Sequence, residues 1–360
     1  MGERIYNFSA GPAMMPESVL HRAASEMLNY NGTGMSVMEM SHRSKVYDAL
    51  FVSVQEKLMK VLNVPQGYKI LFLQGGATLQ FSMIPMNFLP RSGKADYALT
   101  GEFSTKSYKE AKQYGDIHIA GSTESEAFVR VPTQAELTLD AQASYFHYCM
   151  NNTVYGTLWP YIPQTGDVPL VCDMSSCILS EPVDVSRFGL IYAGAQKNMG
   201  PAGLCVVIIR EELAGDTLPG TPNLMNYAKQ IKGNSMMNTP PSYGVYLLGL
   251  ILDWVEEMGG LAAMRTYNTK KADVLYDTLN TCDFYKAVAQ KDCRSLMNVT
   301  FRTPSPEMDD LFVKEAAAQG LGTLKGHRAV GGIRASIYNA MPMEGVEALA
   351  AFMRAFAKNQ

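Results

Sequence analysis

Two kinds of apolar pattern alternate along most of the chain. In some segments apolar residues recur every three or four positions, and in others they form short unbroken runs. The first pattern predicts helices over residues 16–30, 44–62, 79–89 and 104–114. The second predicts strands over residues 69–73, 96–100, 117–120, 145–149, 169–172, 190–193 and 204–210. This alternation indicates an α/β fold with a mainly parallel sheet that is covered on both faces.

The pattern changes after Gly215, where prolines and glycines interrupt the chain as far as Pro241. Two long helices are predicted next, over residues 245–258 and 261–280, and the pair Gly259-Gly260 separates them. The remainder predicts strands over 296–302 and 333–338 and helices over 307–319 and 344–358. We therefore expect a second, smaller α/β domain of about 100 residues.

Composition and charge exclude several classes of protein. The 360 residues are 47% hydrophobic and 18% charged, which is typical of a folded globular chain and not of a disordered one. The 31 basic and 34 acidic side chains leave a formal charge of −3. A near-neutral chain lacks the broad basic surface that non-specific nucleic-acid binding requires.

Targeting and cysteine patterns point to the cytoplasm. The longest apolar stretch, residues 245–255, is shorter than the roughly 20 residues that cross a bilayer, and the first residues show no signal pattern. The six cysteines form no Cys-x-x-Cys pair and most lie in apolar runs. This favours buried free thiols over disulfides or a zinc site. We expect a cytoplasmic protein with no membrane contact and no metal ligands.

The most unusual charged residue is Lys197, in the segment Gly-Ala-Gln-Lys-Asn at 194–198 that follows a predicted buried strand. Its small neighbours leave room for a bulky group against the backbone. Partial burial would lower the pKa of this amine, as Schiff-base formation requires. An ordinary loop lysine is the alternative. Motifs for nucleotide hydrolysis, dinucleotide binding and zinc proteolysis do not occur in the chain.

Two further segments suit the same chemistry. Asp173 follows a buried strand, where it would pair with a protonated pyridine nitrogen, although a helix cap is the commoner role of a lone Asp. Gly75-Gly76 joins a strand to a helix, where backbone N–H groups bind phosphate. A glycine turn, an Asp strand and a Lys strand in this order form the layout of a pyridoxal-phosphate enzyme.

Cationic residues lie at other element boundaries. Two His-Arg pairs, His42-Arg43 and His327-Arg328, lie just outside predicted helices and strands, and Arg334 follows the second pair. Arginine presents a planar fork that suits carboxylate and phosphate. For each residue taken singly, surface charge is the alternative. The pair His21-Arg22 lies within the predicted helix 16–30, where a solvated face explains it.

Several motifs together resemble the phosphoserine aminotransferase family. They are Asn-Phe-Ser-Ala-Gly-Pro at 7–12, Ser-His-Arg at 41–43, Asp-Met-Ser-Ser at 173–176, Gly-Ala-Gln-Lys-Asn at 194–198 and Gly-Ile-Arg-Ala-Ser-Ile-Tyr-Asn at 332–339. The resemblance runs nearly end to end and implies the aspartate-aminotransferase fold. It implies a large pyridoxal-phosphate-binding domain over 16–258 and a small domain over 1–15 and 259–360.

The resemblance also implies an activity and a role for each site residue. The reaction would be transamination from L-glutamate to 3-phosphohydroxypyruvate, giving O-phospho-L-serine in serine synthesis. The family also accepts the phosphohydroxythreonine pair of vitamin B6 synthesis.

In the roles that the resemblance implies, Lys197 would hold pyridoxal phosphate as a Schiff base and move protons, and Asp173 would pair with the ring nitrogen. The other implied cofactor contacts are Gly76, Ala77, Phe103, Thr153 and Gln196, with Asn238 and Thr239 from the partner of an obligate homodimer. The implied substrate contacts are His42, Arg43, His327, Arg328 and Arg334.

One position departs from the family. Where members commonly have Trp in Thr-Gly-Ser-Trp, this chain has Thr-Gly-Glu-Phe at 100–103. Phe103 can stack on a ring but lacks the indole N–H donor, so we expect the function to survive with altered contacts.

The alternative functions are another class V aminotransferase acting on alanine or serine with glyoxylate or pyruvate, a cysteine desulfurase, and a non-catalytic binding protein of the same fold. The two His-Arg pairs argue against the first, because it needs no phosphate pocket.

Overall fold

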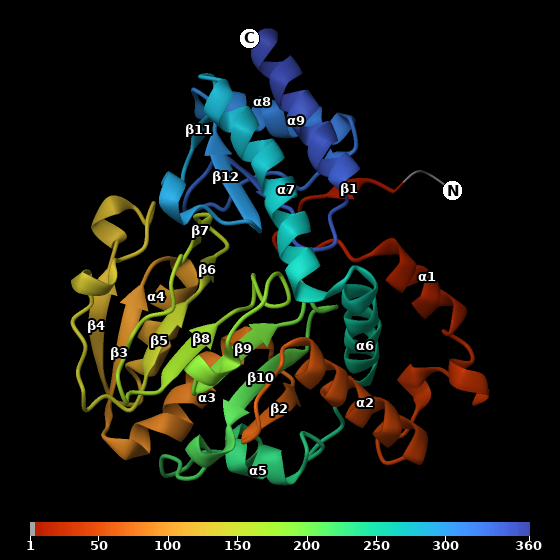
Figure 1. The fold of residues 1–360 in the computed structure, drawn as a ribbon, viewed down its shortest axis with the longest axis vertical. Helices are drawn as coiled ribbons and strands as arrows, with labels where there is room; N and C mark the ends of the chain where they lie inside the picture. Colours follow the sequence, from red (N-terminus) through yellow and green to blue (C-terminus); the bar gives the residue numbers. More distant parts are fainter. Residues whose placement is uncertain (1–3) are drawn as a thin grey trace.

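A seven-stranded sheet forms the centre of the larger body of the computed structural model, which describes residues 4–360 (Figure 1). Residues 1–3 of the expected small-domain segment 1–15 lie outside the described residues. The strand order is β2 (Tyr68–Leu73), β10 (Cys205–Arg210), β9 (Leu190–Gly194), β8 (Leu170–Asp173), β5 (Phe146–Cys149), β3 (Lys94–Leu99) and β4 (Asp116–Ser122). β10 runs antiparallel to both of its neighbours, and the other pairs are parallel, so the sheet is mixed but mainly parallel as expected.

Helices cover both faces of this sheet because its strands are apolar on both faces. In β2, Ile70 and Phe72 face the core under α2 (Lys45–Val61) and α6 (Ser242–Glu257). The alternate residues Leu71 and Leu73 face the core under α3 (Gly76–Phe88) and α4 (Glu102–Ala111). The period-2 alternation of the strands therefore divides the large body into two apolar layers.

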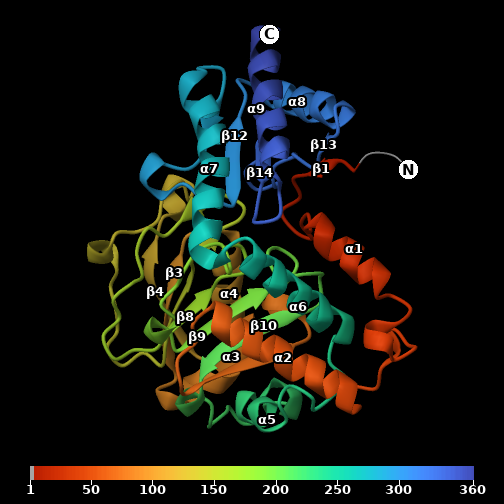
Figure 2. The same ribbon diagram turned by 45° about the vertical axis from the view of Figure 1, so that its right-hand side comes forward.

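A smaller body stands at the upper end of the molecule (Figure 2). Its three-stranded antiparallel sheet has the order β11 (Lys286–Ala287), β12 (Asn298–Arg302) and β14 (Ile333–Ser336). The helices α7 (Gly260–Thr281), α8 (Pro306–Ala318) and α9 (Met343–Lys358) share its core. The N-terminal strand β1 (Tyr6–Asn7) pairs in parallel with β13 (Leu321–Gly322), and Phe8 is buried in the same core.

Three of the differences from the sequence prediction lie at turns or caps. The helix predicted over 16–30 is α1 (Glu17–Ser25). Where it was expected to continue, Asn29 accepts a hydrogen bond from the Gly34 N–H in a turn. The helix predicted from residue 79 begins at Gly76, directly after the glycine turn. A short helix, α5 (Tyr227–Lys232), lies in the stretch that was predicted to be irregular; the Asn226 side chain caps it.

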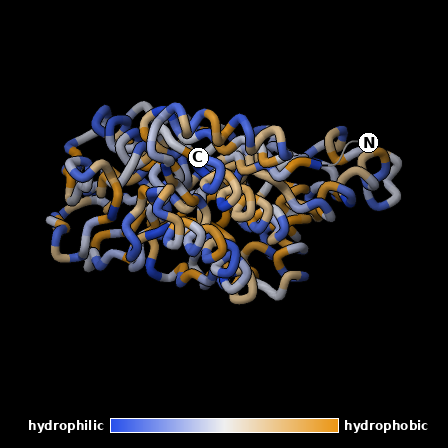
Figure 3. Tube along the Cα trace, turned by 90° about the horizontal axis from the view of Figure 1, so that it is seen from above, coloured by the Kyte–Doolittle hydropathy of each residue, from blue (hydrophilic) through white to orange (hydrophobic). Residues whose placement is uncertain are grey.

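The segment that contains α1 and the short turns η1 (Tyr30–Gly32) and η2 (Val37–Glu39) projects from the body near the N label (Figure 3). Its surface carries several large apolar side chains: Leu28 is 85% exposed, Met35 43% and Met38 57%. His21 lies on the exposed face of α1 beside Glu17, as the sequence indicated. The projection is therefore partly apolar where it meets solvent.

All six cysteines are free thiols, and all except the half-buried Cys282 are buried, as expected. Within residues 4–360, the helices include none with both the length and the apolar character needed to cross a membrane. The same residues contain no group of three or more His, Cys, Asp or Glu side chains placed to hold a metal ion.

The core of the smaller body depends on aromatic packing around Phe312, which is fully buried on α8. Its ring contacts Phe352 at 4.9 Å and Phe356 at 5.2 Å between centroids. Phe312→Ala is expected to lower the free energy of unfolding by about 3–5 kcal/mol, because it removes this area and leaves a cavity. The neighbouring exposed Leu311→Ala is the control, expected to change it by less than about 0.5 kcal/mol. Equal shifts of the urea midpoint in the two variants would contradict this description of the core.

Candidate active site

The candidate site lies at the carboxyl ends of the central strands. β8 ends at Asp173, β9 leads directly to Lys197, and β5 ends at Cys149 in register with Asp173. Thr153 follows β6 (Asn151–Asn152), a short strand paired with β7 (Thr157–Leu158) beside this edge. Open α/β sheets bind ligands at this edge, since several strand ends converge there. A small cavity here is lined by residues that include Phe103, Cys149, Thr153, Asp173 and Lys197.

The Lys197 amine is the central group of the cavity. Its Nζ donates a hydrogen bond to the Thr153 hydroxyl oxygen at 2.8 Å and lies 5.3 Å from the centroid of the Phe103 ring. Burial lowers the pKa of Lys197, while the charge of Asp173 partly opposes this shift. A lowered pKa increases the fraction of neutral, nucleophilic amine. The structure therefore brings together three residues that the sequence singled out separately.

Asp173 is buried, and only 8% of the residue is exposed to solvent. Its Oδ1 accepts a hydrogen bond from the Ser175 N–H at 2.8 Å, and its Oδ2 is 3.9 Å from the Cys149 Sγ. Burial holds the pKa of the Cys149 thiol well above its usual range, so this group stays a weak donor. Within the described chain, Asp173 has no cationic partner within salt-bridge distance. A buried carboxylate in this state suits a cationic ring nitrogen.

The sequence did not identify Cys149 as a site residue. In the sequence it is one of six cysteines that are expected to be buried free thiols, and its contact with Asp173 depends on the register of β5 and β8. Gly11 was also missed as a neighbour of the site. A Cβ atom on Gly11 would lie 3.3 Å from the Lys197 Cγ, and the Ala13 N–H donates to the Gln196 carbonyl at 2.8 Å. The N-terminal segment therefore lies directly against the reactive lysine.

The beginning of α3 provides a place for an anion. Gly75 and Gly76 have φ angles of +86° and +63°, and no side chain caps this helix. The position of a Cβ on Gly76 is open, with no atom within 4 Å. Uncapped N–H groups at a helix N-terminus favour phosphate, and Ala77 follows in the first turn. Gln196, expected nearby, has its Oε1 buried without a hydrogen-bond partner.

Arg334 reaches the site from β14 of the smaller body. Its Nη1 donates to the Thr153 carbonyl oxygen at 3.5 Å. Burial lowers the pKa of Arg334, and no carboxylate among residues 4–360 pairs with it within 4.0 Å. A half-buried guanidinium that has spare donors is a site for a carboxylate ligand. Arg334 thus links the smaller body to the cavity around Lys197.

His327 and Arg328 lie near Glu102, at the outer side of the cavity. The Lys106 side chain, chiefly, and the charges of His327 and Arg328 lower the pKa of Glu102. Burial and the charge of Arg334 lower the pKa of His327. The sequence missed Glu102, which also lines the cavity as the neighbour of Phe103. These residues form a charged rim with more cations than anions.

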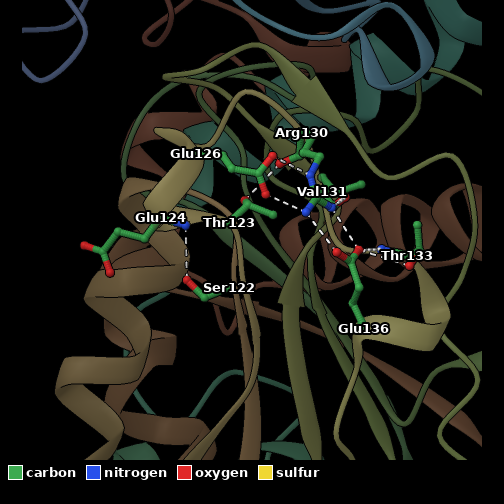
Figure 4. A network of polar contacts seen from close by, with 8 residues as sticks. All are labelled: Ser122, Thr123, Glu124, Glu126, Arg130, Val131, Thr133 and Glu136. Atoms are coloured by element: carbon green, nitrogen blue, oxygen red, sulfur yellow. Dashed lines mark hydrogen bonds and ion pairs between the residues drawn. The ribbon is translucent and has the colours of Figure 1, made fainter.

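An ion-pair network is built around Arg130 (Figure 4). Arg130 binds Glu126 and Glu136 together, with N–O distances of 2.5–2.8 Å. The hydrogen bond from Arg130 is the main reason that the pKa of Glu136 falls to about 2. The network closes the loop that carries Phe128, whose ring lies 4.9 Å from that of Tyr155 beside Phe103.

Four of the expected residues lie apart from Lys197. His42 and Arg43 lie in the half-exposed turn before α2, and no side-chain contact joins them to the cavity. The Asn238 Nδ2 donates to the Gln74 side-chain oxygen at 3.1 Å, and the Thr239 carbonyl accepts from the Gln74 Nε2 at 2.7 Å. The second pair thus lies beside the glycine turn that begins α3.

Comparisons with known proteins show the family of the chain. The family model "Aminotransferase class-V" matches residues 5–349. The phosphoserine aminotransferase of Herpetosiphon aurantiacus is 51% identical over 357 residues, covering 99% of each chain. The solved phosphoserine aminotransferase of Bacillus circulans subsp. alkalophilus superposes with a TM-score of 0.97 at 48% identity, covering 99% of each chain. That of Trichomonas vaginalis, solved with bound PLP, has a TM-score of 0.94 at 40% identity, covering 98% of this chain and 100% of its own.

The effect of the Asp173 charge on the pKa of Lys197 generates a prediction. Because the charge of Asp173 raises the pKa of Lys197 against the effect of burial, Asp173→Asn is expected to lower that pKa further. The pH at which Lys197 of the cofactor-free protein reacts half-maximally with formaldehyde and borohydride then moves downward, as measured by peptide mass spectrometry. The exposed Asp167→Asn is the control and leaves that pH unchanged. An unchanged or higher pH in Asp173→Asn would contradict the assigned coupling.

Proposed function

The chain belongs to the phosphoserine aminotransferase family of the class-V aminotransferases, and on this premise we propose how its residues carry out the reaction. The reaction is the pyridoxal-phosphate-dependent transfer of the amino group of L-glutamate to 3-phosphohydroxypyruvate. The products are 2-oxoglutarate and O-phospho-L-serine, so one amino group moves and atoms balance. The observation that carries the proposal is the buried Lys197 amine between Thr153, Phe103 and Asp173.

The residues present fit pyridoxal phosphate. The uncapped N–H groups of Gly76 and Ala77 would hold its phosphate, and the unpaired Gln196 side chain lies near Lys197. Phe103 would stack on the ring, and the Asp173 carboxylate, free of a cationic partner, would accept the N–H of the ring nitrogen. When bound, the cofactor supplies an aldehyde for Schiff-base chemistry and an electron-withdrawing ring.

Lys197 would act as the proton carrier. Its Nζ, with a pKa lowered by burial, is suited to take the proton from the α-carbon of glutamate and to return a proton in the second half of the reaction. The Thr153 hydroxyl, which accepts from Nζ at 2.8 Å, would orient the amine between these transfers. Asp173 would hold a proton at the ring nitrogen because its own carboxylate is buried beside it.

The cations would select the substrates. Arg334 would bind the α-carboxylate that glutamate and 3-phosphohydroxypyruvate share, since its guanidinium has no carboxylate partner in the described chain. His327 and Arg328 would bind the distal group, either the phosphate or the glutamate γ-carboxylate, with His42 and Arg43. One pocket must accept both anions in turn, and a cluster of His and Arg can do so.

Phe103 keeps the stacking surface that the family's common Trp provides. Its ring lies 5.3 Å from the Lys197 Nζ, and Lys106 lies 5.6 Å from the same ring. The missing indole N–H removes one donor from the cofactor side of the cavity. We therefore expect altered cofactor contacts with the reaction retained.

We propose that the working unit is a homodimer with shared sites. His42 and Arg43 lie apart from Lys197 in the same chain, and the apolar side chains of Leu28, Met35 and Met38 are exposed next to them. If the projecting segment with α1, η1 and η2 packed against a second copy of the chain, its apolar surface would be covered. The same packing would bring His42 and Arg43 to the cavity of the other chain. Asn238 and Thr239 would reach the partner's cofactor phosphate in the same way.

The domain division of 16–258 against 1–15 with 259–360 fits this arrangement. The small domain would present Arg334 to a cofactor held by the large domain. The free thiols suit a reducing compartment, so we place the enzyme in the cytoplasm.

Lys197→Ala tests the assignment of the central residue. The purified wild type, reconstituted with pyridoxal phosphate, is expected to absorb near the visible edge and to convert glutamate and 3-phosphohydroxypyruvate in a coupled assay. Lys197→Ala should lose that absorbance and at least about 10²–10⁴-fold of kcat, because the proton carrier is removed. The exposed Lys109→Ala is the control. A colourless, inactive wild type that binds no cofactor would overturn the proposed function.

Mixed dimers test the sharing of the site. Lys197→Ala and Arg43→Ala chains are each expected to be nearly inactive at low 3-phosphohydroxypyruvate. Half of the dimers formed by refolding the two together are hybrids with one intact site, so activity should rise to about a quarter of the wild type. If each site uses Arg43 and Lys197 of one chain, mixing produces no gain, and the shared site is wrong.

A further inference from the structure

Lys271 on α7 is a fully buried lysine that the proposed chemistry does not use. Four backbone carbonyl oxygens surround its Nζ within hydrogen-bond distance and share its donors: those of Ile337 at 3.3 Å, Asn339 at 3.1 Å, Met341 at 3.1 Å and also Tyr338. The Tyr267 ring lies 4.6 Å from the same nitrogen. Burial alone lowers its pKa, and no carboxylate contributes. The ammonium is therefore held only by backbone dipoles and one aromatic face.

The number of acceptors indicates the charged form. A neutral amine has two N–H donors and a lone pair, and the lone pair would face a carbonyl oxygen at this distance. An ammonium has three donors and no lone pair, which suits a ring of oxygens. Burying such a charge is costly unless it is fully hydrogen-bonded, so the arrangement constrains the carbonyls closely.

The segment that Lys271 binds, residues 337–341, follows β14 directly and so continues the strand that carries Arg334. Tyr338 has a φ of +24°, which is rare for a residue with a side chain, and its carbonyl is one of the four acceptors. The Tyr338 hydroxyl donates to the Ala10 carbonyl at 2.6 Å. The segment thus joins the substrate-binding strand to the N-terminal residues that lie against Lys197.

A second set of contacts leads to the reactive lysine itself. The Asn339 N–H donates to the Asn198 Oδ1 at 3.0 Å, and Asn198 is the residue after Lys197. Asn268, one helical turn before Lys271, donates to the Asn339 Oδ1 at 2.8 Å. α7 therefore holds a segment that follows Arg334 in the chain and that contacts Asn198, the residue after Lys197.

We propose that Lys271 is a positioning residue, whose buried ammonium holds residues 337–341 so that Arg334 and Lys197 are in register across the two bodies. The proposal rests on the roles assigned above to Arg334 and Lys197. A misplacement of about 1 Å in a substrate-orienting group costs as much as about a hundredfold in rate. Because both substrates carry an α-carboxylate, loss of Lys271 should weaken the binding of both.

The test compares variants at residue 271 in the holoenzyme. Lys271→Met keeps the apolar stem and removes the charge and the donors, and Lys271→Gln keeps two donors without charge. KM for glutamate and KM for 3-phosphohydroxypyruvate are expected to rise together, about tenfold or more in Lys271→Met and less in Lys271→Gln. Lys271→Arg, which keeps the charge, is expected to lie nearest the wild type.

Two controls separate positioning from loss of stability or charge. Lys270→Met removes the exposed neighbouring charge on the same helix and leaves both KM values within twofold. Leu349→Ala destabilises the same core from α9, where Leu349 is fully buried, and should lower the urea midpoint without a common rise in KM.

A readout that needs no cofactor or turnover completes the test. Hydrogen exchange of the cofactor-free protein, followed by peptide mass spectrometry, is expected to quicken in residues 333–341 of Lys271→Met and not in Lys270→Met. Folded Lys271→Met or Lys271→Gln with unchanged KM values and unchanged exchange would overturn the proposal. So would failure of both variants to fold, since Lys271 would then be a structural residue only. A wild type without transaminase activity would instead overturn the proposed function, and the exchange result would still stand.

Discussion

The Lys197 amine and the Asp173 carboxylate line one small cavity, out of contact with bulk water, at one edge of the central sheet. Much of the surrounding structure can be understood from the burial of these two groups. Desolvation is the main cause that lowers the pKa of Lys197, and it also makes the buried charge of Asp173 costly. The neighbouring strand ends offset this cost locally, because the Ser175 N–H and the Cys149 thiol contact the carboxylate and the Thr153 hydroxyl accepts from the amine. The site is therefore polar, small and closely surrounded.

The same constraint explains why two bodies meet at this edge. A parallel sheet delivers Lys197 and Asp173 to one end, but it has no nearby cation with free donors. Arg334 comes from the antiparallel sheet of the smaller body, and the N-terminal segment around Gly11 covers the lysine from the same side. Because β1 pairs with β13, that segment is anchored in the smaller body, and the Ala13 N–H also bonds it to Gln196 of the larger one. In the proposed mechanism, the register between the bodies would therefore affect both substrate binding and proton transfer.

Sequence patterns predicted the elements well where apolar periodicity was long and uninterrupted, as in α2 and in β8 to β10. They failed where turn chemistry competes with periodicity: a turn at Asn29 lies where the first helix was expected to continue, and Asn226 begins a helix in a stretch rich in proline. At the site, Lys197 and Asp173 stood out because a charge directly after a buried strand is unusual. Cys149, Glu102 and Gly11 were not expected beside Lys197, although Gly11 and Glu102 lie in quoted motifs, because this placement depends on contacts between distant segments.

The sequence by itself determined the α/β class, the order of the glycine turn, Asp173 and Lys197, and the family to which those motifs belong. These are local properties, since strand periodicity and short motifs depend on neighbouring residues. Only the tertiary structure decided that Asp173 lies against Cys149, that Arg334 reaches Thr153, and that His42 and Arg43 lie apart from Lys197 in one chain. It also revealed Lys271 beneath the segment between Arg334 and Asn339. Contacts of this kind depend on strand register and on how the two bodies pack, which no local pattern encodes.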